Sequence, residues 1–156
     1  RALGHERIVA VDVDPAKFDA AKAAGAAAVV NGRDADALQQ VQAAAGGPLF
    51  GAVDLVNNAP TATLALGAVR KGGHVVLVGL YGGEIPVSLV TIVQRALTIV
   101  GSNVGTVKEL EAVVDLARHG RLQPIPIEVR SITEVSRTLD ELKAGQVTGR
   151  VVAKID

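Results

Sequence analysis

The chain has 156 residues, of which 49% are hydrophobic and 21% charged, and its 16 basic and 16 acidic residues cancel to a formal net charge of zero. A chain of this length suits one domain with at most a small appendage, and without a basic stripe neither nucleic acid nor a membrane surface is expected as a partner. The sequence contains no cysteine, which excludes disulfides and cysteine-ligated zinc, and it has neither a secretory signal pattern nor an apolar run near the roughly 20 residues of a membrane span, so we expect a cytoplasmic protein.

The first predicted element is a short buried strand over residues 8–11 (Ile-Val-Ala-Val), which ends at Asp12. A helix is expected almost at once, since Asp14 is a good N-cap and Pro15 suits the first helical position. In a dinucleotide-binding fold, an acid at the carboxyl end of the second strand accepts both hydroxyls of the adenosine ribose and repels a 2′-phosphate, which favours NAD over NADP. An aspartate that only caps a turn explains the local pattern equally well.

Beyond this turn, the pattern alternates between helices and strands. Helices are predicted over residues 18–25, 34–45 and 61–69, and strands over residues 28–30, 53–56, 74–80 and 97–100, with a short extended segment at 85–88. This repeated order predicts right-handed crossovers and a doubly wound, mainly parallel sheet covered by helices.

The carboxyl-terminal part of the chain begins with the clearest amphipathic helix, over residues 107–119. The composition changes at residues 123–126 (Gln-Pro-Ile-Pro), and an extended segment at 127–129, a helix at 133–144 and a strand at 150–155 are predicted after it. A segment this short cannot bury a core of its own. We therefore divide the chain into a partial nucleotide-binding domain, residues 1–124, and a carboxyl-terminal segment, residues 125–156.

Four motifs, taken in order, carry a resemblance to a known family. They are Val11-Asp12-x-Asp14-x-x-Lys17, Arg70-Lys71-Gly72-Gly73-x-Val75-Val76-x-Val78-Gly79, Gly101-Ser102-x-x-Gly105-Thr106 and Ala144-Gly145-Gln146-Val147-x-Gly149-Arg150-Val151-Val152. In this order they resemble the medium-chain dehydrogenase/reductase family, and in particular its zinc-dependent alcohol dehydrogenase branch. The resemblance covers the later half of such an enzyme. It implies an α/β, Rossmann-like sheet that lacks its first strand and the Gly-x-Gly-x-x-Gly turn, plus a small strand–helix–strand segment that in the family packs with the catalytic domain.

The resemblance implies cofactor-binding roles for residues near the ends of the predicted strands. Asp12 is expected to bind the adenosine ribose, Val13 to lie against the adenine, and Lys17 to reach the same ribose. An exposed lysine is an equally good interpretation of Lys17. The other implied positions are Asn58 and Ala59, then Val78, Gly79 and Leu80 around the nicotinamide, the backbone of Ser102 and Val104 at the carboxamide, and Arg150 on the pyrophosphate or, alternatively, in a surface salt bridge.

The resemblance further implies NAD as the cofactor and an alcohol or aldehyde as the substrate, with hydride transfer between the alcohol and NAD in the complete enzyme. Zinc is expected only in the amino-terminal domain, which this sequence does not contain. We therefore assign no catalytic or metal-binding residue, and we expect the chain alone to be inactive. The three histidines, His5, His74 and His119, lack ligand spacing, and Ser131 and Thr133 are interpreted as helix caps.

Family members pair their sheets edge to edge, which predicts a homodimer or a tetramer. The edge would come from the extended segment that begins at Ile85 and ends at Leu89 and from the strand that begins at Leu97 and ends at Val100.

Two other functions stay open at this point. One is a non-catalytic nucleotide-binding module. The other is an S-adenosylmethionine-binding, methyltransferase-like domain, which also ends its second strand on an acid and suits the Lys71-Gly72-Gly73 turn, but not the strand that starts at Arg150.

Overall fold

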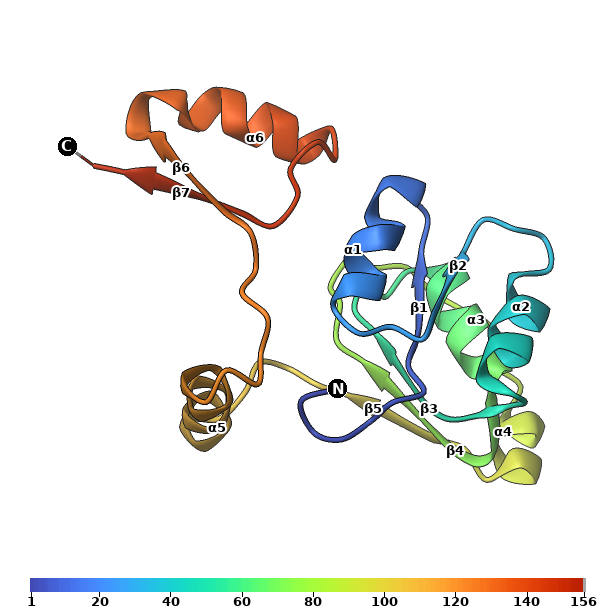
Figure 1. The fold of residues 1–156 in the computed structure, drawn as a ribbon. Helices are drawn as coiled ribbons and strands as arrows, with labels where there is room; N and C mark the ends of the chain where they lie inside the picture. The colour runs from blue at the N-terminus through green and yellow to red at the C-terminus, as the bar shows by residue number, and fades with distance from the viewer. Residues whose placement is uncertain (156) are drawn as a thin grey trace. The chain divides into compact units, whose positions relative to one another are not determined.

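The structure, a computed structural model, describes residues 1–155 and contains two compact units, Arg1–Val114 and Asp115–Asp156. In the first unit, strands and helices alternate along the chain (Figure 1). They are β1 (Val9–Asp12), the 3-10 turn η1 (Pro15–Lys17), α1 (Phe18–Ala23), β2 (Ala28–Asn31), α2 (Ala37–Ala45), β3 (Leu49–Asp54), α3 (Ala59–Ala68), β4 (Val69–Leu77), α4 (Leu89–Arg95) and β5 (Thr98–Gly101). Helix α5 (Val107–Arg118) begins in the first unit and ends in the second, which contains β6 (Ile127–Ser131), η2 (Ile132–Glu134), α6 (Val135–Lys143) and β7 (Arg150–Lys154).

Local capping bonds explain where several of these elements begin. The Asp14 carboxylate accepts the N–H of Ala16 at 3.0 Å, and Pro15 holds the first position of η1, as the sequence predicted. In the second unit the Ser131 hydroxyl accepts the N–H of Thr133 at 3.3 Å and caps η2, so the interpretation of Ser131 as a cap is confirmed.

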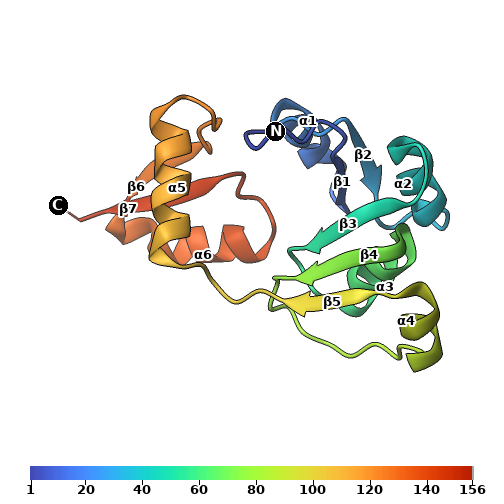
Figure 2. The same cartoon turned by 90° about the horizontal axis from the view of Figure 1, so that it is seen from below.

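All the strand pairings are parallel, which confirms the predicted class of fold. Within the first unit, however, the strands form two sheets, β1-β2 and β3-β4-β5 (Figure 2). Among residues 1–155, no strand pairs with the second edge of β1 or of β3. The strands of the predicted sheet are therefore present, but they do not form one continuous ladder.

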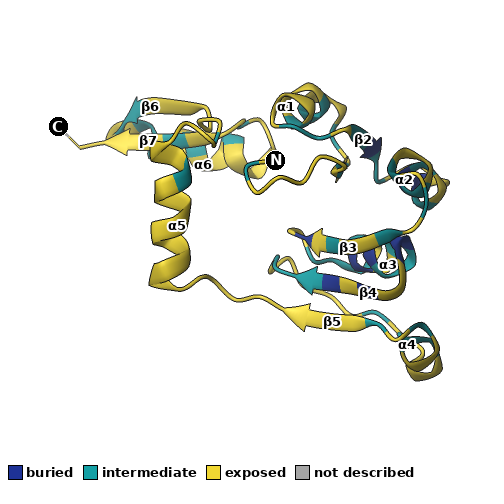
Figure 3. Ribbon diagram, turned by 60° about the horizontal axis from the view of Figure 1, so that its bottom comes forward, coloured by how far each residue is buried: buried dark blue, intermediate teal, exposed yellow. Residues whose placement is uncertain are grey.

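The core of the first unit is small and consists mainly of alanine and valine. One cluster joins Val30 of β2 to Ala37 and Val41 of α2, and a second joins α3 to Val69 and Val75 of β4. Figure 3 shows the buried residues gathered where α2 and α3 meet the strands. On β3 the alternate positions Gly51 and Val53 are exposed, Val53 by 63%, whereas Ala52 packs against the second cluster, so α3 covers only one face of this part of the strand.

The predicted strand over residues 53–56 is misplaced. Strand β3 starts earlier, at Leu49, and ends at Asp54. The Asp54 carboxylate accepts the N–H groups of Val56 and Asn57, and these groups are then no longer available to a neighbouring strand. The strand is also less buried than predicted.

The segment from Ile85 to Leu89 does not form the predicted edge. Residues 85–88 are in no strand, and Leu89 is the first residue of α4. Ser88 keeps an extended backbone, and its hydroxyl accepts the N–H of Thr91 at 3.3 Å, which caps a helix that begins at Leu89, the last residue of the predicted edge segment. Of the two segments predicted to supply the edge, the one that forms β5 does lie at an edge of its sheet, opposite β3.

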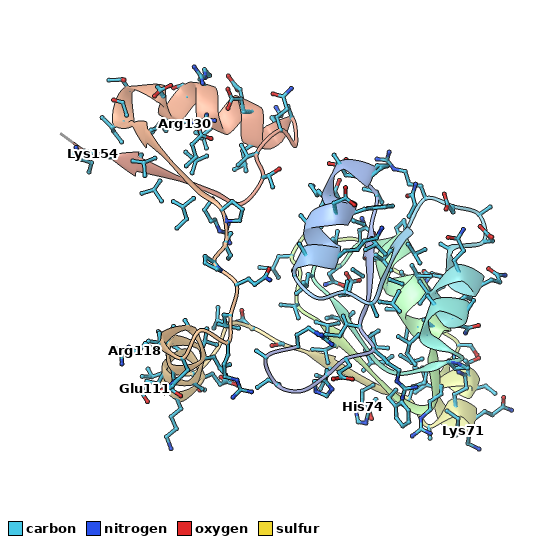
Figure 4. The ribbon with its side chains drawn as sticks, viewed as in Figure 1. Lys71, His74, Glu111, Arg118, Arg130 and Lys154 are labelled. Atoms are coloured by element: carbon cyan, nitrogen blue, oxygen red, sulfur yellow. The ribbon has the colours of Figure 1, made fainter. Side chains whose placement is uncertain are left out.

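The second unit pairs β6 with β7 in parallel and places α6 between them in sequence. Its side chains centre on Arg130, labelled in Figure 4, which is 12% exposed. The Arg130 guanidinium donates to Glu128 at 2.8 Å and to Glu141 at 2.6 Å. None of the helices in residues 1–155 has both the length and the apolar character to cross a membrane.

Candidate functional site

The carboxyl end of β1 presents a half-buried acid. Asp12 Oδ1 accepts the N–H of Asp14 at 2.9 Å, and the Asp12 carbonyl accepts the N–H of Gly32 at 3.1 Å. These bonds fix the direction of the carboxylate at the end of the strand. The next residue, Val13, is 41% exposed, so an accessible apolar side chain follows the acid directly. A hydroxyl-bearing group with an apolar face is the kind of ligand that such a pair suits.

Lys17 lies one helical turn beyond this acid. Its Nζ is 3.7 Å from Asp14 Oδ2, and the two side chains are 42% and 39% exposed. An ion pair this accessible to solvent contributes little to stability. The ammonium group thus lies next to the β1 turn and stays accessible to solvent.

The ends of β3 and β4 are joined by a dense set of hydrogen bonds. The Asp54 carbonyl accepts the N–H of Val78 at 2.9 Å and of Gly79 at 3.1 Å, which extends the contact between the strands past the end of the sheet. A Cβ on Gly79 would lie 2.3 Å from the carbonyl carbon and oxygen of Val56. Glycine is therefore required here by a close backbone approach.

The loop after β5 joins the same region. The N–H of Ser102 donates to the Leu77 carbonyl at 2.9 Å, which places Ser102 beside the end of β4. Val104 has a left-handed φ of 50° and is 87% exposed. Next along the chain, the Glu109 carboxylate accepts the N–H and hydroxyl of Thr106 at 2.6 and 2.8 Å, and these bonds lower the pKa of Glu109.

The predicted site residues thus fall into three groups. The first group lies around the neighbouring ends of β3, β4 and β5 and consists of Asn58, Val78, Gly79 and Ser102. Next to it are Ala59, the first residue of α3, and two exposed loop residues, Leu80 and Val104. Asp12, Val13 and Lys17 lie at the end of the other sheet of the first unit. Arg150 starts β7 in the second unit, where it is exposed.

Three residues of this region received no role from the sequence: Asp54, Asn57 and Thr61. The Asp54 carboxylate accepts the Thr61 hydroxyl at 2.7 Å, and Asn57 Nδ2 donates to the Gly79 carbonyl at 2.9 Å. The sequence feature that could have indicated them is a charged residue inside a predicted apolar strand, with two asparagines directly after that strand. That signal suggests a polar turn, but it does not identify a partner 22 residues away.

The histidines and acids do not gather into a metal site. Within residues 1–155, no group of three or more potential metal ligands lies together. His74, labelled in Figure 4, is an exposed residue of β4, three positions before the end of the strand at Leu77. His119 follows α5, where its Nδ1 lies 2.9 Å from the Asp115 carbonyl.

The second unit contains a pocket of about 240 Å³ lined mainly by apolar residues of α6 and β7, including Leu139, Leu142 and Val151. Arg130 and Arg150 lie at its wall. Hydrogen bonds from Arg130 lower the pKa values of Glu128 and Glu141, and these acids in turn raise the pKa of the guanidinium. The Arg130 guanidinium at the pocket is thus paired with two acids, which suits a structural role.

Comparison with known proteins gives a consistent result. The sequence model of the family described as zinc-binding dehydrogenase matches residues 1–119. An alcohol dehydrogenase of Geobacillus stearothermophilus is 37% identical over 149 residues, which are 96% of this chain and 44% of the relative. An alcohol dehydrogenase of Moraxella sp. is 32% identical over 145 residues, which are 93% of this chain and 42% of that relative.

A solved structure, the alcohol dehydrogenase from the archaeon Aeropyrum pernix, superimposes with a TM-score of 0.83 at 30% identity, covering 94% of this chain and 42% of that one. The predicted Rossmann-like α/β architecture is confirmed by this similarity. The chain spans less than half the length of the relatives that it matches.

Proposed function

The chain belongs to the zinc-binding dehydrogenase family, and from that membership we propose that it is the NAD-binding part of a zinc-dependent alcohol dehydrogenase. In the complete enzyme a hydride would pass between an alcohol and NAD. The relatives named above are alcohol dehydrogenases, which supports an alcohol or aldehyde as the substrate class.

The observation that carries the proposal is the acid at the end of β1. The Asp14 N–H donates to the Asp12 carboxylate and fixes its direction. Because Asp12 is only half-buried, the carboxylate is still accessible to solvent. Parallel α/β folds bind nucleotides at the carboxyl ends of their strands, where such an acid can accept the two ribose hydroxyls. The exposed Val13 beside it suits the apolar face of adenine.

We assign the remaining contacts along the same ligand. NAD, when bound, supplies the hydride acceptor of the reaction. Its nicotinamide end would lie at Val78, Gly79 and Leu80, near Asn58 and Ala59. The backbone of Ser102 and Val104 would bind the carboxamide, Lys17 the ribose and Arg150 the pyrophosphate, since a guanidinium matches phosphate oxygens as a fork of donors.

The residues that the structure describes, 1–155, do not fit a zinc ion. The described residues bring together no set of three potential ligands, and we assign no step on this chain to a metal. In our proposal the metal and its ligands belong to the part of the complete enzyme that the sequence does not contain. Two further predictions accompany it: a cytoplasmic location, and a homodimer or tetramer in which β5 provides the paired edge.

Isothermal titration of the protein with NADH, NADPH and S-adenosylmethionine tests the proposal. We expect NADH to bind, NADPH to bind more weakly because of its 2′-phosphate, and S-adenosylmethionine not to bind. In Asp12→Asn, the amide oxygen can still accept the Asp14 N–H, but the charge is lost. Hydrogen bonds to a charged group contribute about 1.5–3 kcal/mol, so the affinity for NADH should fall roughly 10- to 100-fold.

Asp19→Asn is the matched control, because Asp19 is an exposed acid of the neighbouring α1. It removes the same charge and should leave the affinity for NADH unchanged. Tight binding of S-adenosylmethionine with none of NADH would favour the methyltransferase-like alternative. Equal binding of NADH and NADPH would remove the role given to Asp12.

A further inference from the structure

Asp54 is the one charged side chain that is buried in residues 1–155, with 6% of its surface exposed. A buried carboxylate is costly unless hydrogen bonds replace its lost water. Asp54 has such bonds on both oxygens. Oδ1 accepts the N–H of Val56 at 3.0 Å and of Asn57 at 2.8 Å, and Oδ2 accepts the Thr61 hydroxyl at 2.7 Å. The acid therefore fixes the loop between β3 and α3.

The bonds of Asp54 hold Asn57 in an uncommon conformation. Asn57 has a φ of 61°, in the left-handed region that asparagine tolerates better than most residues. In this conformation its Nδ2 donates to the Gly79 carbonyl at 2.9 Å. Gly79 is thereby held at both of its peptide groups, since its N–H donates to the Asp54 carbonyl at 3.1 Å.

The first residues of α3 are tied to the same acid. Asn58 Oδ1 accepts the N–H of Thr61 at 3.0 Å, and Thr61 Oγ1 accepts the N–H of Asn58 at 3.1 Å, which is a reciprocal capping box. Because the Thr61 hydroxyl also donates to Asp54, one carboxylate positions both the loop and the start of the helix. No other strand end of the first unit has such a network on a buried charge.

We propose that Asp54 and Asn57 are positioning residues that fix the backbone of Gly79 for the nicotinamide end of the cofactor. This inference rests on the proposed function. Neither residue is assigned a contact with the cofactor. They act through the Gly79 peptide, whose position is also restricted by its close approach to Val56.

The test compares two ligands that share one end. NADH and ADP-ribose both carry the adenosine ribose and the pyrophosphate, but only NADH carries the nicotinamide. Asn57→Asp replaces the donor to the Gly79 carbonyl by an acceptor, while aspartate still tolerates a positive φ. Losing one hydrogen bond and placing two acceptors together should weaken NADH binding by roughly tenfold or more. ADP-ribose should bind Asn57→Asp and the unmodified protein equally.

Gln42→Glu is the matched control. Gln42 Nε2 donates to the carbonyl of another glycine, Gly67, at 3.5 Å, between α2 and α3. The same exchange of an amide for a carboxylate there should leave both affinities unchanged. Asn57→Gly provides a second test if Asn57→Asp does not fold, because glycine adopts the left-handed conformation freely and lacks the donor.

The outcomes separate this inference from the proposed function. Loss of NADH affinity with ADP-ribose affinity retained supports the positioning role. Unchanged NADH affinity in folded Asn57→Asp or Asn57→Gly overturns it, and so does an equal loss for both ligands, which indicates general damage to the fold. If the unmodified protein binds neither ligand, the proposed function fails and the inference fails with it. Asp12→Asn, in contrast, should weaken both ligands.

Discussion

The close approach of Gly79 to the β3–α3 loop can be tested by adding a single methyl group. In Gly79→Ala the new Cβ would lie 2.3 Å from the Val56 carbonyl carbon and oxygen and 2.5 Å from the Leu55 carbonyl oxygen. These neighbours are backbone atoms, so no side chain can rotate away. The φ of Gly79 is outside the left-handed region, and the cost must come from this contact.

We expect the free energy of unfolding to fall by about 1–3 kcal/mol, the usual range for forcing an extra carbon into a packed site. With a urea m-value of about 2 kcal/mol/M, the unfolding midpoint should fall by roughly 0.5–1.5 M. Circular dichroism at 222 nm across a urea series measures this shift. The helices α1 to α4 of the first unit contribute to this signal.

Gly101→Ala is the control for this prediction. Gly101 ends β5, its φ is also outside the left-handed region, and its added Cβ would meet nothing within 4 Å. Its free energy of unfolding should stay within about 0.5 kcal/mol of that of the unmodified protein. Equal midpoints for Gly79→Ala and the unmodified protein, or equal losses for the two alanine variants, would refute the assignment of the cost to the Val56 contact.

Three further predictions concern the caps and ion pairs. Asn58→Ala removes the side-chain cap of α3 and should lower the free energy of unfolding by about 1 kcal/mol in a urea titration, whereas Asn58→Asp should retain the cap. The pKa of Glu109 lies below its ordinary value of 4.5. Its ionised carboxylate therefore stabilises the start of α5 fully above pH 4.5, and this stabilisation is lost as the pH falls through the lowered pKa. Helicity should accordingly decline on acidification in the unmodified protein and decline less in Glu109→Gln. Arg130→Met removes the cation closest to Glu141 and should speed thermolysin cleavage within residues 115–155. Arg137→Met removes a second, more exposed cation from the same acid and should change the cleavage rate less.

The sequence predicts a site residue most reliably where the determinants are local. Asp14 and Pro15 start η1 because a side-chain acceptor and a missing N–H act within one turn. The acid at Asp12 could be placed for the same reason, since a short apolar run ends directly before it. Ser131 is a similar case.

The errors occur where a local preference competes with a more distant or stronger contact. The sequence predicted no element over residues 90–95, where the branched side chains of Val90, Ile92 and Val93 favour extended structure, but the Ser88 cap and the left-handed Ala96 enclose helix α4 there. Strand β3 ends at Asp54 because its side chain captures the following N–H groups. The bond from Asn57 to Gly79 joins residues of two strand ends, and no spacing along the sequence reveals it.

Strand β4 is the only strand in residues 1–155 that has a neighbour on each side. Its amide protons should accordingly exchange with deuterium most slowly, while those of the two-stranded β1-β2 sheet should exchange earlier. If the dinucleotide binds as proposed, its nicotinamide would then lie on the sheet that opens later and its adenosine on the sheet that opens earlier.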